Sequence, residues 1–390
     1  MTFSAADHAH MAEALRLAGL GLDTTTPNPR VGCVIVRDGE VVGRGFHARA
    51  GEPHAEVHAL REAGERARGA TAYVTLEPCA HHGRTPPCAE ALVRAGVTRV
   101  VAALTDPNPL VGGQGLARLR EAGIEAESGL LAAQARTLNA GFLRRIAGGL
   151  PWLRLKLASS LDGRTAMADG ESQWITGPEA RADVQRWRAR SCAIITGIGT
   201  VLADDPALTV RAADGTTDGL RQPRRVVLDT DLQLPPSARV VTGPGTVLAI
   251  TLGPEGLQDA ALAEWLDEAD PARAERARAL LAAGVALAGV EGDDDGRPDL
   301  RAVLRLLADA GCNEVLVEAG AGLAGSCLEA GVVDELVLYQ AMTLMGSAAR
   351  PLAELPLARM AEQRRLRCTD LRQLGGDLRL VLVPAHDERN

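Results

Sequence analysis

Apolar residues in the first part of the chain recur in short runs separated by longer helical patterns. The segment VGCVIVRDGEVVGRGF, residues 31–46, carries two apolar runs on either side of Asp38 and Gly39. An Asp-Gly pair between apolar runs is a strong signal for a tight two-residue turn, so the segment predicts a β-hairpin. Upstream, Ser4 and Asp7 have the spacing of a capping box, which predicts a helix that begins just after Ser4.

Helical and strand-like patterns continue to alternate after the hairpin. We expect a helix that begins near His54, a strand in AYVTL, a helix over Pro86–Ala95 and a strand in RVVAAL. Alternation of this kind is typical of an α/β domain whose sheet is covered by helices on both faces.

The pattern is interrupted in AGGLP, residues Ala147–Pro151, where two glycines and a proline end a helix before a new strand. The chain is therefore predicted to form two domains, 1–147 and 151–390. In the second domain we expect strands in WLRLKLASS, DELVLYQ and LRLVLV, with helices between them. The alanine-rich stretch Ala260–Gly284 predicts a surface helix, and the acidic run Asp293–Gly296 predicts a solvated loop.

Composition narrows the class of protein. The 390 residues are 46% hydrophobic, but no apolar run approaches the length of a membrane span, and the N-terminus lacks the pattern of a secretory signal. A formal net charge of −8, with three Phe, two Tyr and four Trp, disfavours a nucleic-acid binder and favours a small-molecule substrate. Seven scattered cysteines are typical of a reducing compartment, so we expect a cytoplasmic protein with free thiols.

Candidate metal ligands lie at the starts of two predicted helices and after one strand. His54 and Glu56 open the helix in PHAEVHAL, Cys79 follows the strand AYVTL and a proline, and Cys88 follows two prolines. His54, Cys79 and Cys88 together would leave one tetrahedral position of a zinc ion open, as in catalytic sites. Ligation by His81 or His82 would instead close the site. The alternative interpretation is two buried thiols beside a core histidine.

The order H-x-E, then P-C and a second cysteine, is also the signature of zinc deaminases, in which the glutamate moves protons and does not bind the metal. One feature departs from that signature. Its cysteines are usually separated by two residues, whereas eight residues separate Cys79 from Cys88.

Longer motifs resemble one family throughout the chain. PNPRVGCVIV, GEPHAEVHAL, AYVTLEPCAHHGRTPPC and TDPNP in the first domain are similar to the bifunctional riboflavin-biosynthesis deaminase–reductases, which share the long cysteine spacing. KLASSLDGRTA, GESQWITG, TVLADDPALTVR and VEAGAGLAGS in the second domain resemble the same family, in the same order. The resemblance implies a cytidine-deaminase-like α/β/α domain followed by a dihydrofolate-reductase-like α/β domain.

The resemblance also implies roles for the candidate residues of the first domain. His54, Cys79 and Cys88 are expected to bind one Zn²⁺ per chain, with Glu56 as the catalytic proton shuttle. His81 and His82 are then not ligands, but belong to a loop that either shapes the substrate pocket or is simply polar surface. His58 is expected to pack or to support the ligands. Asn28 and His47 are candidates for holding the pyrimidine ring, although an asparagine that stabilises the PNP turn is an equally good explanation.

A glycine motif marks the second domain. Gly320, Gly322 and Gly325 form G-x-G-x-x-G after the apolar strand EVLV, but alone this is a weak signal, because the acidic partner of a Rossmann motif is missing. Through the resemblance we expect NADPH to contact Ala158, Trp174, Thr200, Asp204, Gly320, Ala321, Gly322, Leu323, Ala324, Gly325 and Ser326. The expected substrate contacts are Ser172, Arg188, Leu208, Arg211 and Glu318, with Arg188 and Arg211 at the phosphate.

The implied activity is deamination of 2,5-diamino-6-ribosylamino-4(3H)-pyrimidinone 5′-phosphate, followed by reduction of its ribosyl group with NADPH. Asp204 and Lys156 are both candidate proton donors for the reduction. A homo-oligomer that binds neither nucleic acid nor membrane is expected. Two alternative functions are a nucleic-acid deaminase with an accessory domain, which the acidic net charge and the few aromatic residues disfavour, and a metal and nucleotide sensor without catalysis.

Overall fold

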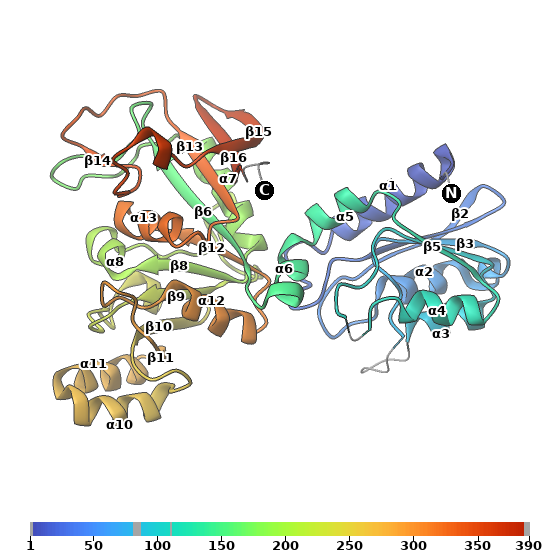
Figure 1. Cartoon of the computed structure of the whole chain (residues 1–390), viewed down its shortest axis with the longest axis horizontal. Helices are drawn as coiled ribbons and strands as arrows, with labels where there is room; N and C mark the ends of the chain where they lie inside the picture. The colour runs from blue at the N-terminus through green and yellow to red at the C-terminus, as the bar shows by residue number, and fades with distance from the viewer. Residues whose placement is uncertain (1–2, 81–86, 110, 386–390) are drawn as a thin grey trace. The chain divides into compact units, whose positions relative to one another are not determined.

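The structure is a computed structural model that describes residues 3–80, 87–109 and 111–385 (Figure 1). Its internal contacts divide the chain into two compact units, Met1–Gly149 and Leu150–Asn390. Each unit contains its own central β-sheet, so the two are described separately. No helix in the described part of the chain is long and apolar enough to cross a membrane.

A five-stranded sheet forms the centre of the first unit, in the order β2-β1-β3-β4-β5. The predicted hairpin is confirmed, because β1 and β2 pair in antiparallel register, and Asp38 and Gly39 between them have φ angles of 52° and 83°. Positive φ at both central residues is what a type I′ turn requires. The strands are β1 (Gly32–Arg37), β2 (Glu40–Phe46), β3 (Thr71–Val74), β4 (Arg99–Ala102) and β5 (Glu125–Ser128).

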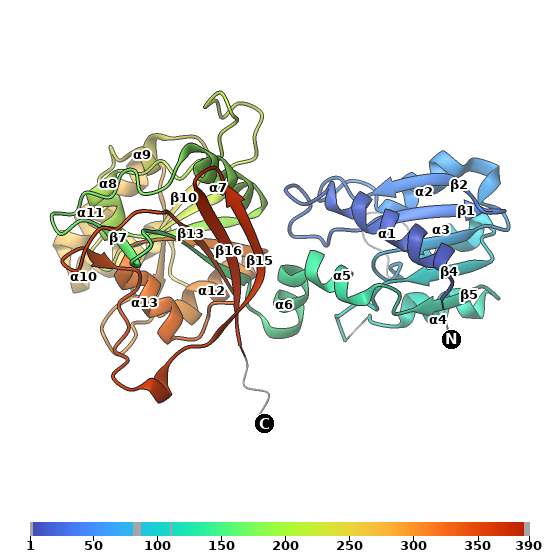
Figure 2. The ribbon, with the colours of Figure 1, turned by 90° about the horizontal axis from the view of Figure 1, so that it is seen from above.

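Helices cover both faces of this sheet, as the alternating pattern predicts. The helix α1 packs on β1 and β3 and contacts α5, whereas α2, α3 and α4 follow one another across the opposite face (Figures 1 and 2). The predicted capping box is formed by Ser4 and Asp7. The helices are α1 (Ala5–Gly19), α2 (Ala55–Ala63), the 3₁₀ turn η1 (Gly64–Ala67), α3 (Cys88–Ala95), α4 (Gln114–Glu121), α5 (Ala132–Leu138) and α6 (Ala140–Gly148).

The second unit is built on a nine-stranded sheet in the order β11-β10-β9-β8-β12-β6-β13-β16-β15. The strands from β11 to β13 are parallel to their neighbours, and β16 and β15 are added antiparallel at one edge. The strands are β6 (Trp152–Ser159), β8 (Ala193–Gly197), β9 (Arg224–Leu228), β10 (Val247–Leu252), β11 (Ala286–Val290), β12 (Glu314–Glu318), β13 (Glu335–Gln340), β15 (Leu366–Leu374) and β16 (Asp377–Pro384), beside the small pair β7 (Arg164–Ala166) and β14 (Arg350–Pro351).

The prediction of a single helix over Ala260–Gly284 is wrong. The stretch Ala260–Gly284 forms two helices, α10 and α11, because Pro271 begins a new helix and Asp270 caps it by accepting a hydrogen bond from the Arg273 amide at 3.1 Å. Both helices lie at the surface, as predicted, and each buries one face. The helices are α7 (Pro178–Arg190), α8 (Ile198–Asp204), α9 (Arg239–Thr242), α10 (Asp259–Ala269), α11 (Pro271–Ala282), α12 (Leu300–Asp309), α13 (Ala321–Glu329) and the 3₁₀ turn η2 (Met360–Glu362).

The parallel strands of the second unit end together at one edge of the sheet. Strands β8 and β12 are neighbours, and each is followed within two residues by a helix, α8 after β8 and α13 after β12. In open α/β sheets, ligands bind at the carboxyl ends of the parallel strands. This edge is therefore where a cofactor site is expected.

Candidate active sites

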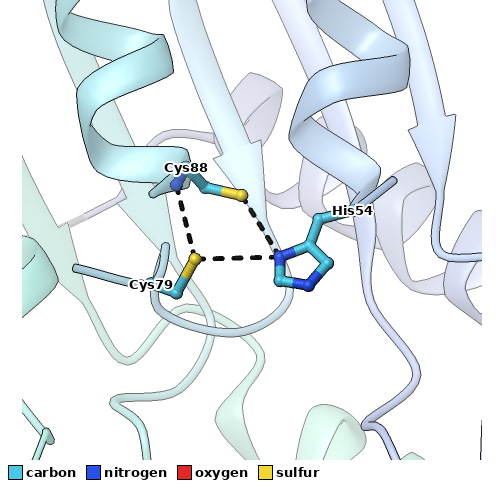
Figure 3. Close-up of side chains that lie close together, drawn as sticks. All are labelled: His54, Cys79 and Cys88. Carbon is cyan, nitrogen blue, oxygen red and sulfur yellow. Dashed lines mark hydrogen bonds between the residues drawn. The ribbon is translucent and has the colours of Figure 1, made fainter. Parts of the chain in front are cut away.

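Three chain segments of the first unit bring His54, Cys79 and Cys88 together (Figure 3). His54 is the N-cap of α2, Cys88 is the first residue of α3, and Cys79 lies in the segment that follows β3. The Nδ1 atom of His54 is 3.7 Å from Cys79 Sγ and 3.3 Å from Cys88 Sγ. The convergence of helix starts that the sequence pattern predicts is thus present in the structure.

The donor set fits a zinc ion. Bond lengths of about 2.1 Å to nitrogen and 2.3 Å to sulfur at a tetrahedral angle place the two donor atoms roughly 3.6 Å apart. The three potential ligand atoms lie within 4.8 Å of one another, and the described residues add no fourth His, Cys, Asp or Glu to the group. One nitrogen and two sulfur donors with room for a fourth ligand are typical of a catalytic site.

The environment of the two thiols favours a thiolate. A hydrogen bond from Cys88 lowers the pKa of Cys79 to about 4, despite its burial. The backbone N–H of Cys88, at the start of α3, also donates to Cys79 Sγ at 3.3 Å. Both effects stabilise negative charge at Cys79, which is the form that binds a metal. Because Cys88 is the donor, the same hydrogen bond raises the pKa of Cys88.

Glu56 lies two residues after His54, in the first turn of α2. Its side chain is 3% exposed, and its Oε2 accepts no hydrogen bond within the described residues. Burial raises the pKa of Glu56 to about 7. A carboxyl group with a pKa near neutrality can both accept and release a proton, which suits a shuttle.

Two further side chains adjoin the ligands. His47 is buried, and its ring meets that of His54 edge-on, with centroids 5.4 Å apart. The Asn28 amide donates to His47 Nε2 at 3.0 Å, so Nδ1 of His47 carries the proton and donates to the Pro53 carbonyl at 3.2 Å. Burial lowers the pKa of His47, so its ring is held neutral. His47 therefore lies beside the ligand His54, and Asn28 is hydrogen-bonded to His47; a role of either residue in holding the substrate ring stays a prediction.

Sequence reasoning did not assign Glu77, which lies two residues before Cys79. Its buried carboxylate accepts hydrogen bonds from the amides of Asp106 and Gly113, both at 2.9 Å, and of Leu116 at 3.0 Å. It thus joins the Cys79 segment to the start of α4. The available signal is the acidic residue in TLEPC, but its partners lie 29, 36 and 39 residues further along the chain and have no motif of their own.

Three further histidines lie near this site in the sequence, and of these the structure describes only His58. His58 lies one turn after His54 on α2 and is not part of the donor group. His81 and His82 lie outside the described residues.

A cavity of about 740 Å³ opens at the carboxyl edge of the second sheet. Every expected substrate residue lines it, and so do Lys156 and most of the expected NADPH residues. The predicted residues at its wall are Ala158, Ser172, Trp174, Arg188, Thr200, Asp204, Leu208, Arg211, Glu318, Gly320, Ala321, Gly322 and Leu323.

Three of the predicted NADPH residues do not line the cavity. Ala324 is buried in the core, and the Ser326 hydroxyl donates to the Gly322 carbonyl at 3.2 Å. Gly325 faces the backbone of Glu354, where a Cβ atom would lie 1.9 Å from the carbonyl oxygen. The third glycine of the motif therefore permits close packing of α13, and a contact with NADPH stays a prediction for these three residues.

An ion pair, a half-buried lysine and a hydroxyl–carboxylate hydrogen bond lie in the cavity wall. Arg188 donates from Nε to Glu318 Oε1 at 2.6 Å and from Nη2 to Glu318 Oε2 at 2.9 Å. Burial lowers the pKa of Lys156, while Glu318 opposes that effect. The Ser172 hydroxyl donates to Asp204 at 2.9 Å.

Trp174 stands at the cavity mouth. Its side chain is 69% exposed, and the guanidinium of Arg181 lies 4.5 Å from its ring centroid. An exposed aromatic ring beside a cavity can stack on a planar ligand.

Two family descriptions match the chain. Residues 4–104 match the cytidine and deoxycytidylate deaminase zinc-binding region, and residues 151–380 match the RibD C-terminal domain. The chain is therefore a bifunctional enzyme that joins a zinc-binding deaminase domain to a reductase domain, which confirms the predicted fold class.

Relatives of full length identify the family. The riboflavin biosynthesis protein RibD of Escherichia coli (strain K12) is 51% identical over 389 residues, which cover 97% of this chain and all of the relative. The chain belongs to the family of the riboflavin biosynthesis protein RibD. Among solved structures, RibD of Acinetobacter baumannii, form 1, is 47% identical with a TM-score of 0.86, covering 98% of this chain and 99% of that one.

A further solved structure is described as a diaminohydroxyphosphoribosylaminopyrimidine deaminase/5-amino-6-(5-phosphoribosylamino)uracil reductase from Thermotoga maritima. It is 30% identical, with a TM-score of 0.81, and covers 97% of this chain and 99% of its own. The resemblance inferred from the motifs is thereby confirmed.

Proposed function

We propose that this chain deaminates 2,5-diamino-6-ribosylamino-4(3H)-pyrimidinone 5′-phosphate and then reduces the ribosyl group with NADPH to give 5-amino-6-(5-phosphoribitylamino)uracil. The two activities named for the relative from Thermotoga maritima support this assignment. The observation that carries the first step is the group formed by His54, Cys79 and Cys88 near the buried carboxylate of Glu56, whose Oε2 accepts no hydrogen bond within the described residues.

In deamination, zinc bound by the three ligands supplies a Lewis acid that makes water a competent nucleophile near neutral pH. The Glu56 carboxylate accepts the proton of the attacking water and delivers it to the departing amino group, which leaves as ammonia. Asn28 and His47 hold the pyrimidine ring, since their hydrogen-bonded pair lies beside His54. Because that pair is fixed before substrate binds, little ordering is needed on binding.

In reduction, the residues of the cavity wall would hold NADPH, which would supply the hydride. Gly320 to Leu323, at the start of α13, line the cavity, and the N–H groups of a helix N-terminus suit the cofactor's phosphates. Ala158, Trp174, Thr200 and Asp204 complete the cofactor contacts, while the substrate contacts are Ser172, Arg188, Leu208, Arg211 and Glu318. Lys156 is the proposed proton donor, because an ammonium group in the cavity wall carries protons and Glu318 lies close to it.

The deaminase is assigned to residues 1–147 and the reductase to residues 151–390. The two compact units and their separate family matches support this division. We further propose that the enzyme is a cytoplasmic homo-oligomer. All seven cysteines are free thiols, which suits a reducing compartment.

The metal site is the first test. The purified protein should contain about one zinc per chain, as a single mononuclear site requires. It should release ammonia from the diaminopyrimidine substrate. Cys88→Ala should lose both zinc and ammonia release, because the remaining ligands are too few. Cys368→Ala removes an exposed thiol of the second unit and should change neither. Metal analysis by atomic emission that finds stoichiometric zinc in the Cys88 variant would rule out the ligand assignment.

A further inference from the structure

The guanidinium of Arg188, one of the two arginines expected at the substrate phosphate, already makes three hydrogen bonds within the protein. Two hydrogen bonds join its fork to Glu318, and Nη1 donates to the Thr209 carbonyl at 2.9 Å. The side chains of Arg188 and Glu318 are only 12% and 10% exposed. Three of the five guanidinium N–H groups of Arg188 are therefore committed to the protein, which leaves two for a phosphate group.

Arg239, which no sequence motif pointed to, lines the same cavity. It is the first residue of α9, and its backbone N–H donates to Asp205 Oδ1 at 2.8 Å. Its guanidinium makes one long contact, from Nη1 to the Asp205 carbonyl at 3.4 Å. Within the described residues, no carboxylate oxygen lies within 4.0 Å of this guanidinium.

The positive charge of Arg239 acts on the pKa of Arg211. Burial lowers the pKa of Arg211, and the positive charges of Arg188 and Arg239 lower it further, with Glu318 as the opposing charge. Arg211 likewise forms no ion pair within the part of the chain that is described. Two guanidinium groups that lack acidic partners and face one cavity repel each other unless an anion lies between them.

We propose that Arg239 joins Arg211 and Arg188 in binding the phosphate of the substrate. This inference rests on the proposed reductase function. The cofactor's phosphates have a separate partner in the backbone amides at the start of α13, which follows β12. Arg211 and Arg239 come from other segments, the loop after α8 and the start of α9.

Ribose 5-phosphate is a suitable probe, because it carries the phosphorylated sugar without the pyrimidine. Arg239→Ala should raise its Kd in isothermal calorimetry about 10- to 100-fold, the usual effect of losing one charge-assisted contact. Arg239→Lys should recover only part of the affinity, since an ammonium group lacks the fork. Arg224→Ala, an exposed arginine at the start of β9 outside the cavity, is the matched control and should bind as the wild type does.

Kinetic measurements distinguish the phosphate of the substrate from the phosphates of NADPH. In Arg239→Ala the KM for the deaminated, phosphorylated substrate should rise by a similar factor, while the KM for its dephosphorylated form and the Kd for NADPH stay unchanged. Equal binding of ribose 5-phosphate by the wild type and Arg239→Ala overturns the inference, as does a weakened affinity for NADPH in its place. If the wild type binds ribose 5-phosphate through Arg239 but reduces no substrate, the proposed function fails and the anion site stands.

Discussion

Glu56 is buried without a hydrogen-bond partner for one of its carboxylate oxygens, a state that costs free energy in a folded protein. Such a group is retained where its proton chemistry is used. Its raised pKa follows from burial, so the same environment that destabilises the charged form makes the group a proton carrier near neutral pH.

Replacement of this carboxylate separates proton transfer from metal binding. Glu56→Gln keeps the size of the side chain but removes its basicity, so deamination should fall about 10²-fold or more. Zinc content should stay at the wild-type level, and reduction of already deaminated substrate should continue. Ammonia release, metal analysis and NADPH absorbance measure the three outcomes. Glu52→Gln, an exposed acid just before α2, is the control. Nearly normal deamination in the Glu56 variant would assign the proton shuttle to another group.

Single residues differ in how far the sequence reveals them. His54, Cys79 and Cys88 could be predicted because each lies beside a helix start or a strand end, positions that local patterns mark. Glu77 and Arg239 could not. Their partners are Asp106, Gly113 and Leu116 for the first and Asp205 for the second, and these pairings exist only once distant segments have packed. The pairing of Arg188 with Glu318 is hidden in the sequence for the same reason.

At the scale of elements, the start of α4 supports the segment that carries Cys79. Gly115 in the first turn of α4 is so close to that segment that a Cβ atom would lie 1.9 Å from the Pro78 carbonyl oxygen. The Glu77 carboxylate then accepts the amides around the helix start, where the helix dipole also favours a negative charge. One side chain thus fixes both a helix end and the approach to a metal ligand.

Glu77→Gln tests this coupling. An amide can replace one acceptor oxygen but turns its NH₂ group toward backbone donors. The free energy of unfolding of the first unit should therefore fall by about 1–3 kcal/mol. Deamination should fall more than reduction, since Cys79 is two residues away. Differential scanning calorimetry and the two activity assays measure the effects. Glu121→Gln, at the exposed far end of α4, should leave both unchanged. An unaltered melting transition in the Glu77 variant would show that its hydrogen bonds do not support the site.

Elements with strong local signals could be predicted from the sequence, whereas boundaries that depend on a single residue were harder. The hairpin at Asp38 and Gly39 was evident because both residues tolerate positive φ. The stretch Ala260–Gly284 was expected to form one helix, because a continuous alanine-rich pattern conceals the break that Asp270 and Pro271 introduce. The glycine motif marked the start of α13 correctly, but Gly325 serves packing against Glu354.

At the scale of the whole molecule, the hydrophobic cores separate into two sets. The core cluster built on β1 to β5 draws only on residues of the first unit, and the other three clusters draw only on residues of the second. A domain with its own closed core can fold alone. The division into two units therefore has an energetic basis as well as a geometric one.

Truncation tests the assignment of one activity to each domain. A chain of residues 151–390 retains every strand of the nine-stranded sheet and the whole cavity wall, because β6 begins at Trp152. It should fold cooperatively, contain no zinc, and oxidise NADPH when given the deaminated phosphoribosylamino substrate. The complementary chain of residues 1–147 should hold zinc and release ammonia from the diaminopyrimidine. Circular dichroism on heating establishes folding before either assay. If the 151–390 chain melts cooperatively yet leaves NADPH unoxidised, the reductase site requires residues of the first domain, and the division of activities at Pro151 is wrong.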